Sequence, residues 1–492
     1  MTAIPFDNSY ARLPEAFYTR LDPTPVSDPG LIAVNRPLAL QLGIDPEWLA
    51  SEEGVQVVAG NAVPDGAEPL ASVYSGHQFG SYNPQLGDGR AILLGEVVDT
   101  GKHRYDIQLK GSGPTPYSRG GDGRSPLGPV LREYVVSEAM YALGVPTTRA
   151  LAAVTTGEQV IRDEFLPGAV LARVASSHIR IGTFQYFSAH NDTEALHQLT
   201  QHVLVRHYPE ALVSENHGLA LLQAVVARQA SLVANWQLLG FIHGVMNTDN
   251  MLLSGETIDY GPCAFMDEFQ ADKVFSSIDH AGRYAYRNQP GIAHWNLACL
   301  AQCLIPLLHD DKDQAVKLAQ ACIDSFPDVF LQAHTKGMAR KLGLETIGEA
   351  DTALVEDLFQ LMSEHSMDFT LTFRRLADLA NESAGSSAAV GELFEIPDAL
   401  LPWLAQWRQR QQQEANTPAK RQAIMYSANP AFIPRNHLVE DVIQAGPRDN
   451  DLAPFFKLNE VLASPFEYRP EDSRYAIPPR PEQEVRQTFC GT

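Results

Sequence analysis

The sequence predicts an α+β protein in which a small mixed α/β lobe precedes a larger, mainly helical lobe. Three observations lead to this prediction. The 492 residues exceed the roughly 250–300 that one hydrophobic core serves, so more than one packed unit is expected. Strand patterns gather between residues 91 and 175 around one long helix, and helical patterns dominate after residue 192. We expect the following division: an N-terminal extension packed on the fold over 1–60, the mixed lobe over 61–175, the helical lobe over 176–467 and an extended tail over 468–492.

The elements of the mixed lobe follow from side-chain alternation and from turn residues. AILLGEVV and the alternating segment that ends at Lys110 are separated by Asp99-Thr100-Gly101, which predicts a hairpin. The segment GSGPTPYSRGGDGRSPLG is too rich in Gly, Pro and Ser for a regular element and predicts a long loop. In chain order we expect a short helix at 36–42, a helix start at Asp45-Pro46, strands at 91–98 and 104–109, a loop at 111–128, a helix from Pro129 to just before Gly144, and strands at 150–155, 159–161 and 171–174.

The helical lobe contains one long amphipathic pattern and one expected interruption. Residues 219–239 repeat Ala, Leu, Val and Gln at helical spacing over about five turns. Two short strands are expected at 250–254 and 257–260, with Gly255 as the turn of a hairpin. Helical patterns then continue to about residue 412, except for the polar stretch 381–387.

Composition excludes several classes of protein. Hydrophobic residues make up 45% of the chain, which rules out bulk disorder. The formal net charge of −22 repels nucleic acid and anionic membranes, so neither is an expected partner. Before Lys273 the only lysines are Lys102, which falls in a turn, and Lys110, which ends a strand. If this half of the chain uses an ammonium group, only Lys110 can point from a strand into a cleft.

The cysteines and the N-terminus suggest a location. Five cysteines without a CxxC pair indicate neither a disulfide scaffold nor a structural zinc site, so a reducing compartment is expected. Cys299 and Cys303 fall four apart in an apolar helical stretch and are expected to be buried. The first twenty residues match neither a secretory signal nor a transit peptide, and no run of about 18 apolar residues occurs. We expect a cytoplasmic protein.

Two groups of residues carry the expected chemistry. The first is Gly87-Asp88-Gly89-Arg90 before a strand, Lys110 at the end of the next strand and Glu133 early in the long helix. Glycines let the backbone approach a phosphate, and a strand lysine paired with a helix glutamate supplies a fixed positive charge. Taken singly, each is also explained by a common turn or a surface ion pair.

The second group lies in FIHGVMNTDNMLLSGETIDYGPCAFMD. Asn250 begins the expected hairpin and Asp259 closes it, which places an amide and a carboxylate on neighbouring strand ends. Hard oxygen ligands of this kind suit Mg²⁺ bound with nucleotide phosphates. The alternative is that both residues only cap turns.

Together these residues resemble the protein-kinase-like fold, which has a Gly-rich turn, a strand lysine, a helix glutamate, an H-x-D-x-x-x-x-N loop and a D-F-G motif in this order. Here the loop reads His243, Val245, Asn250, so a valine replaces the catalytic aspartate. Asp249 stands beside Asn250, and a general base need only lie within hydrogen-bond reach of the attacking hydroxyl.

The loop GSGPTPYSRGGDGRSPLG after the lysine and the NTDN and DYGP segments narrow the match. With YSGHQFGSYNPQLGDGR and NPAFIPRN, they make the chain similar to the selenoprotein O (YdiU) family of pseudokinases over nearly its whole length. The resemblance implies a bilobal kinase-like fold and protein adenylylation: ATP binds in a flipped orientation, AMP passes to a Ser, Thr or Tyr side chain of a protein substrate, and pyrophosphate leaves.

The resemblance also implies roles for particular residues. Asp249 would be the proton acceptor, Glu133 would position Lys110, and Asn250 and Asp259 would hold Mg²⁺ or Mn²⁺. Asp122 can accept hydrogen bonds from the nucleotide base or ribose, and Gly123 leaves room for the ring. The residues expected to contact ATP are Gly87, Gly89, Arg90, Lys110, Asp122, Gly123, Arg173, Arg180 and Asp259.

Three other functions remain open from the sequence. A uridylyltransferase that uses UTP with Mn²⁺ is compatible because no base-reading residue is identifiable. An ordinary phosphotransferase could use Asp249 as its base, and an inert nucleotide-binding scaffold could keep the fold for stability. Cys490 matches the place where some family members carry selenocysteine, and Cys263 is its most plausible disulfide partner, although an idle thiol explains Cys490 equally well.

Overall fold

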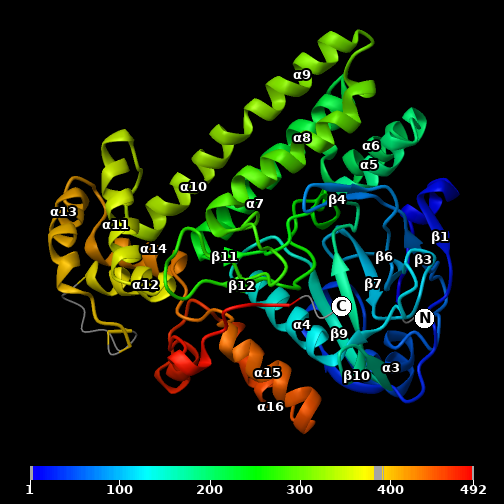
Figure 1. Cartoon of the computed structure of the whole chain (residues 1–492), viewed down its shortest axis with the longest axis horizontal. Coiled ribbons are helices and arrows are strands. Elements are labelled where there is room, and N and C mark those ends of the chain that lie inside the picture. Colours follow the sequence, from blue (N-terminus) through cyan, green and yellow to red (C-terminus); the bar gives the residue numbers. More distant parts are fainter. Residues whose placement is uncertain (1–3, 382–389, 392, 490–492) are drawn as a thin grey trace.

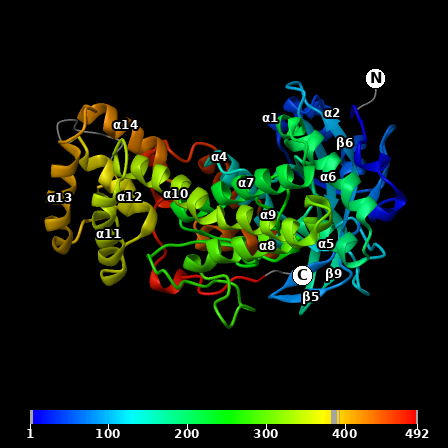
Figure 2. The ribbon, with the colours of Figure 1, turned by 90° about the horizontal axis from the view of Figure 1, so that it is seen from above.

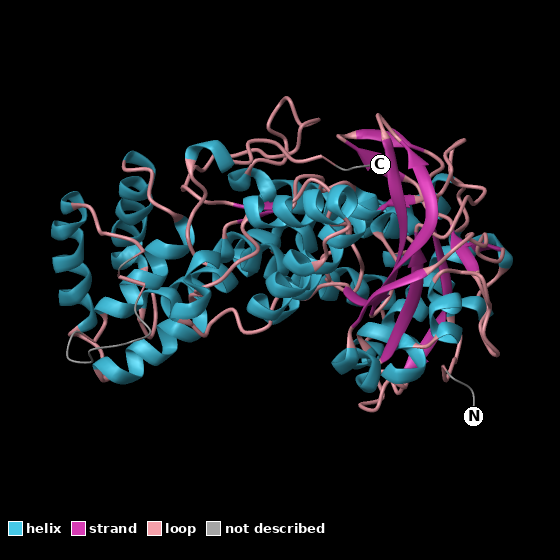
Figure 3. Cartoon of the chain, turned by 90° about the horizontal axis from the view of Figure 1, so that it is seen from below, coloured by secondary structure: helices cyan, strands magenta, loops and turns pink. Residues whose placement is uncertain are grey.

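The computed structural model describes residues 4–381, 390, 391 and 393–489. The strands gather at one end of the molecule, and the helices extend away from them (Figures 1 and 3). The predicted α+β class is confirmed, with an antiparallel sheet in the N-terminal part and a helical C-terminal part. Cys490 lies outside the described residues, and so does most of the polar stretch 381–387.

The main sheet is antiparallel and has the strand order β1-β3-β6-β7-β10-β9-β2, with β8 paired to β10. The predicted hairpin is β6–β7, in which Ala91 pairs with Lys110. The two strands expected at 150–161 form one long strand. The bounds are β1 Tyr18–Arg20, β2 Gly30–Val34, β3 Leu70–Ser72, β6 Ala91–Val98, β7 Arg104–Lys110, β8 Ser125–Pro126, β9 Arg149–Ile161 and β10 Phe165–Ala175.

Helices cover both faces of this sheet. The predicted long helix is α4, Leu127–Ala142, which begins two residues before Pro129 and packs against β9 and β10. On the other face, α1 (Arg36–Gln41), α2 (Pro46–Ala50) and α3 (Glu52–Val58) bury Leu38, Leu49 and Val55 with residues of the central strands. The Asp45 side chain accepts from the Glu47 amide, which caps α2 where the sequence indicated a helix start.

The helical part is built around α7, His217–Leu239, which packs against α6, α8, α9 and α10. Asn216 caps its first turn, and Gly240, at φ 69°, ends it in the left-handed conformation that glycine adopts without cost. The neighbouring helices are α5 Ile181–Ala189, α6 Thr193–His207, α8 Gln289–Leu308, α9 Lys312–Asp324, α10 Phe326–Leu342, α15 Asn436–Asp449 and α16 Ala453–Leu462.

A second, smaller core lies at the end of the molecule opposite the sheet (Figure 2). It is formed by α11 Thr352–Glu364, α12 Phe369–Leu379, α13 Leu401–Gln411 and α14 Pro418–Ala428, which gather around the end of α10. Lys341 is buried there, with its ammonium nitrogen 4.1 Å from the ring centre of Phe373. Because this lysine is buried and lies outside the cleft, its protonation should make the stability of the fold depend on pH.

One helical stretch among the described residues, Tyr286–Leu308, is long and apolar enough to cross a membrane by length and composition. It contains α8, which packs against α5, α7 and α9, and half of its most apolar window is buried. Core helices of globular proteins pass the same test.

The hairpin expected at 250–254 and 257–260 was wrong. Leu252 forms a single bridge with Arg180, and Thr257 forms one with Thr147, so the segment pairs with other loops instead of with itself. A short pair, β11 (Phe241–Ile242) and β12 (Ala264–Phe265), flanks it instead. Gly255 is nevertheless a turn residue, at φ 75°.

The C-terminal tail is less extended than expected, because 3₁₀ turns form at Pro470–Tyr475 and Pro481–Gln483. Its last described residues pair with a loop of the helical part. The Thr488 amide donates to the Phe275 carbonyl at 2.7 Å, and its hydroxyl donates to the Pro262 carbonyl at 2.6 Å. This contact brings residues 485–489 to the wall of the cleft described next.

Candidate active site

The predicted pair of Lys110 and Glu133 forms between the sheet and α4. Gln108 and Lys110 are two apart on β7 and therefore share one sheet face, and Arg173 on β10 pairs opposite Gln108. That face meets α4, which carries Glu133. The Lys110 Nζ lies 2.5 Å from Glu133 Oε2, and both side chains are buried. The alternative that Lys110 and Glu133 form an ordinary surface ion pair is therefore excluded.

The Asp259 carboxylate contacts three cationic side chains, one of which is Lys110. Its Oδ1 lies 2.8 Å from the Lys110 Nζ and 2.7 Å from Arg173 Nη1, and its Oδ2 lies 2.9 Å from Arg180 Nη1. The Asp259 backbone has φ 62°, a left-handed conformation that is uncommon for residues other than glycine. Backbone outliers of this kind cluster at functional sites, and this one aims the carboxylate at the cations.

The charges of this network act on one another strongly because they are buried. Burial raises the pKa of Asp259, but the charges of Lys110, Arg173 and Arg180 outweigh it and hold the pKa well below its usual range. Glu133 follows the same pattern, with a lowered pKa set by Lys110 and Arg173 against burial. Both carboxylates are therefore ionised at neutral pH.

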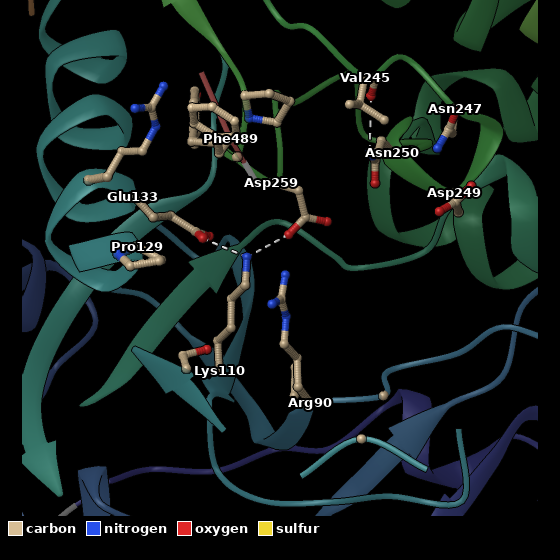
Figure 4. Close-up of a pocket in the computed structure, with 18 of the residues that line it drawn as sticks. Arg90, Lys110, Pro129, Glu133, Val245, Asn247, Asp249, Asn250, Asp259 and Phe489 are labelled. Carbon is tan, nitrogen blue, oxygen red and sulfur yellow. Dashed lines mark hydrogen bonds and ion pairs between the residues drawn. The ribbon is translucent and has the colours of Figure 1, made fainter. Parts of the chain in front are cut away.

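The segment with valine in place of the usual aspartate lies on the helical side of the cleft. Val245, Asn247, Asp249 and Asn250 all line the cleft, and Figure 4 shows them on the side opposite Lys110 and Glu133. The Asn250 amide nitrogen donates to the Val245 carbonyl at 3.0 Å, which fixes the direction of its side chain. Arg180 joins the two sides because its Nη1 also donates to the Asp249 carbonyl at 2.6 Å.

Asp249 differs from the other acids of the site. Burial raises its pKa to about 6, and the charge of Arg180 only partly offsets this effect. Its Oδ1 atom is buried and has no hydrogen-bond partner among the described residues. A carboxylate with a raised pKa and a free oxygen is suited to accept a proton near neutral pH.

The Gly-rich turn lies at the edge of the cleft, and packing accounts for its glycines. A Cβ at Gly87, which has φ 139°, would meet the Tyr117 ring at 2.4 Å, and one at Gly89 would meet the Tyr117 carbonyl oxygen at 2.8 Å. The loop that follows Lys110 is thus held against this turn. Arg90 points into the cleft beside Lys110 (Figure 4), and its side chain has no acidic partner in the part of the chain that the structure describes.

Asp122 and Gly123 line the same cleft but do not join the Lys110 network. Asp122 forms a two-pronged ion pair with Arg162, at 2.8 and 3.2 Å, near the tip of the β9–β10 hairpin. A Cβ at Gly123 would lie 2.1 Å from the backbone of Gly113, so close packing within the loop requires glycine there. At this part of the cleft wall Asp122 is exposed and Gly123 is buried.

The cleft has a volume of about 880 Å³. Its wall contains every residue that the sequence analysis expected to contact ATP, to hold the metal or to take part in catalysis: Gly87, Gly89, Arg90, Lys110, Asp122, Gly123, Glu133, Arg173, Arg180, Asp249, Asn250 and Asp259.

Sequence reasoning missed three polar residues of this site. Asp88 is buried, with its Oδ1 3.7 Å from Arg180 Nη2, and it stood within the quoted Gly-rich turn. Gln108 accepts from Arg173 at 2.6 Å, and its position two before Lys110 on a strand was the available signal. Arg162 gave no signal, because only the folded hairpin brings it to Asp122.

The donor set suits a hard metal ion bound with phosphates. Asp259 offers carboxylate oxygens and Asn250 an amide oxygen, and no group of three or more His, Cys, Asp or Glu side chains able to hold a metal occurs among the described residues. Mg²⁺ is commonly held by one or two protein oxygens with water and phosphate oxygens completing its octahedron. The residues present therefore fit an ion that arrives with a nucleotide.

The cysteines do not enter this chemistry in the described structure. Cys263, Cys299, Cys303 and Cys322 are free and buried, as expected for Cys299 and Cys303. Burial raises the pKa of the Cys263 thiol. Its proposed pairing with Cys490 lies outside the described residues.

A cleft between a sheet and a helical part, with a paired lysine and an unpaired arginine facing carboxylate and amide oxygens, defines a nucleotide-dependent transferase. The family model "Protein adenylyltransferase SelO" matches residues 1–463. The protein nucleotidyltransferase YdiU of Bradyrhizobium sp. (strain BTAi1 / ATCC BAA-1182) is 60% identical over 488 residues, 99% of each chain. The protein of the same name from Rhizobium meliloti (strain 1021) is 58% identical over 492 residues, 100% of each chain. The chain belongs to the SelO family of protein adenylyltransferases and is a protein nucleotidyltransferase.

Proposed function

We propose that the protein transfers AMP from ATP to Ser, Thr or Tyr hydroxyls of other proteins and releases pyrophosphate. The acceptor oxygen attacks the α-phosphorus, the bond from that phosphorus to the oxygen bridging to the β-phosphate breaks, and the hydroxyl proton passes to Asp249. The observation that carries this proposal is the cationic cleft of an acidic protein, in which Arg90 and Lys110 lie with Asn250 and Asp259 in one wall.

The valine at position 245 supports the choice of the α-phosphate. We infer a kinase-like bilobal fold in which the usual loop aspartate is missing, so no base lies at the usual place for transfer of the γ-phosphate. Asp249, with its raised pKa and free Oδ1, is the remaining candidate base on that segment. A flipped ATP would bring its α-phosphate toward this side of the cleft.

The remaining residues bind and orient the nucleotide. Lys110, Arg173 and Arg180 already hold a carboxylate group, and their donors suit phosphate oxygens equally. Glu133 keeps Lys110 in place. Asp122 and Gly123, which also line the cleft, would contact the ribose or base.

Asn250 and Asp259 would hold Mg²⁺ or Mn²⁺. When bound, the ion neutralises phosphate charge and polarises the phosphorus under attack. This role fits the lowered pKa of Asp259, because an ionised carboxylate is the better ligand for a hard cation.

A phosphotransferase that uses Asp249 is the alternative, because the same base could serve either phosphate. The test is mass spectrometry of proteins incubated with the enzyme, ATP and Mg²⁺ or Mn²⁺. We expect peptides that carry an AMP group on a hydroxyl with the unmodified enzyme and none with Asp259→Ala. Peptides that carry only a phosphate would refute adenylyl transfer.

A further inference from the structure

A small hairpin lies directly over the candidate base. It consists of β4, Gly76–Gln78, and β5, Ser81–Asn83, and it is separate from the main sheet. Figure 1 shows β4 between the sheet and helices α5 and α6. The hairpin lies within YSGHQFGSYNPQLGDGR, the segment that ends in the Gly-rich turn of residues 87–90.

The hairpin is tied to the catalytic segment residue by residue. The His77 amide donates to Thr248 Oγ1 at 2.7 Å, and the Phe79 amide donates to Asn247 Oδ1 at 3.0 Å. Between them, Gln78 Nε2 donates to Asp249 Oδ2 at 3.2 Å. Three successive residues of the hairpin thus contact three successive residues of the segment.

Helix α5 supports these contacts from behind. Gln185 accepts from the Thr248 hydroxyl at 2.6 Å and its amide lies 2.8 Å from His77 Nδ1. Tyr284 adds a second hydrogen bond to Asn247 Oδ1, at 2.7 Å. The hairpin is therefore held in one position relative to Asp249.

The turn of the hairpin is strained in a way that favours a functional role. Phe79 and Gly80 both have positive φ, 51° and 84°, as a two-residue type I′ turn requires. Asn, Asp or Gly usually occupies the first of these positions, because a bulky side chain there is unfavourable. Such strain is retained where the surrounding structure over-determines it, commonly at active sites.

Gln78 is the only side chain that donates a hydrogen bond to the Asp249 carboxylate in the described part of the chain. Gly76 closes the other side: a Cβ there would lie 2.4 Å from Asp249 Oδ1. The carboxylate is therefore oriented by one neutral side-chain amide, and its Oδ1 has no hydrogen-bond partner among the described residues. Gln78 also lines the cleft.

We propose that Gln78 is a positioning residue that fixes the orientation of the Asp249 carboxylate toward the acceptor hydroxyl. The inference rests on the proposed role of Asp249 as proton acceptor. It assigns to Gln78 an effect on the transfer step and none on the binding of ATP, because Lys110 and Glu133 lie on the side of the cleft opposite Asp249 (Figure 4).

The test is a double-mutant cycle of Gln78→Leu and Asp249→Asn. The rate of α-labelled AMP incorporation into casein, an acceptor rich in serine and threonine, is measured over a range of ATP concentrations. We expect Gln78→Leu to lower kcat by about tenfold to a hundredfold, the usual effect of losing a hydrogen bond to a charged group. We expect the KM for ATP to stay unchanged. In the Asp249→Asn background, Gln78→Leu should have little further effect, because neighbours that act through one group are not additive.

Gln85→Leu is the matched control, since Gln85 is exposed and does not line the cleft. It should keep the unmodified rate. Stabilisation of each variant by ATP in a thermal melt shows that the nucleotide site is folded, and loss of this stabilisation in Gln78→Leu would contradict the proposal. Multiplicative losses in the double variant, or a raised KM for ATP with unchanged kcat, would also overturn it. If the unmodified enzyme transfers no AMP, the proposed function itself is wrong. That outcome differs from a failure of the Gln78 proposal alone, in which the unmodified enzyme transfers AMP and Gln78→Leu does so equally well.

Discussion

The Lys110 ammonium nitrogen lies 2.8 Å from Asp259 Oδ1, so the lysine proposed to bind phosphate and the carboxylate proposed to bind the metal form an ion pair with each other. If both residues act as proposed, a bound nucleotide and its metal would exchange this contact for contacts to phosphate and to the ion. Such an exchange would keep the charges of the buried site balanced, because Lys110 would gain a phosphate and Asp259 a cation.

Replacing Lys110 with methionine should weaken the binding of ATP. Removal of the ammonium group takes away a charge-assisted hydrogen bond to phosphate, which corresponds to a rise of about tenfold to a hundredfold in the Kd for ATP. Isothermal titration with ATP and Mg²⁺ measures this directly. Lys102→Met is the matched control, because Lys102 is exposed in a turn and should leave the Kd unchanged.

Replacing Asp249 with asparagine should separate binding from chemistry. The variant keeps the shape of the side chain and loses the proton acceptor, so the rate of AMP transfer should fall by about 10²- to 10⁴-fold. The Kd for ATP should change little. An Asp249→Asn enzyme that keeps its rate would show that this residue is not the base.

Replacing Arg173 with methionine should destabilise the protein. Arg173 is buried and bonds to Glu133 and Asp259, at 3.0 and 2.7 Å, so its loss removes two hydrogen bonds between buried charged groups. Leaving a buried hydrogen-bonding group without its partner costs about 1–3 kcal/mol, and more for a charged group. Urea unfolding should show a lower midpoint. Arg287→Met, which breaks an exposed pair with Asp272, should leave the midpoint in place.

Replacing Lys341 with methionine should stabilise the protein in a pH-dependent way. Burial lowers the pKa of Lys341 to about 7, well below the 10.5 that is usual for an exposed lysine. Between these values the unfolded chain binds more protons than the folded one, so the stability of the unmodified protein rises with pH from about 7 toward 10.5.

The gain from Lys341→Met should therefore be largest below pH 7 and shrink as the pH rises above it. Melting temperatures at a series of pH values measure this gain. Lys317→Met, at an exposed position on α9, serves as the control. A gain in melting temperature that does not vary with pH would show that burial does not disfavour the charged form of Lys341.

The sequence predicted local features of this site better than its assembly. Lys110 and Glu133 could be found because strand alternation and helix spacing act over a few residues. The convergence of Arg173 and Arg180 on Asp259 could not, because about eighty residues separate these positions and only the packing of β10, α5 and the Asp259 loop brings them together. For the same reason the partner of Asp122, Arg162 on a distant hairpin tip, was missed.

The wrong hairpin at 250–260 has a physical cause as well. Its residues have the alternation and the turn glycine of a hairpin, but their backbone groups bond to the loops around Thr147 and Arg180. Local pattern specifies an extended conformation without specifying its partner. The hairpin at 76–83, in contrast, was not expected, because its strands have three residues each and its turn carries Phe79 where glycine or asparagine is usual.

The most direct test of adenylyl transfer compares two labels in one reaction. The enzyme is incubated with casein and Mg²⁺ or Mn²⁺, once with ATP labelled at the α-phosphate and once with ATP labelled at the γ-phosphate, and the protein-bound label is measured. We predict that the α-label appears on protein and that the γ-label appears only in released pyrophosphate. Transfer of the γ-label to protein, with the α-label left in ADP, would contradict the account.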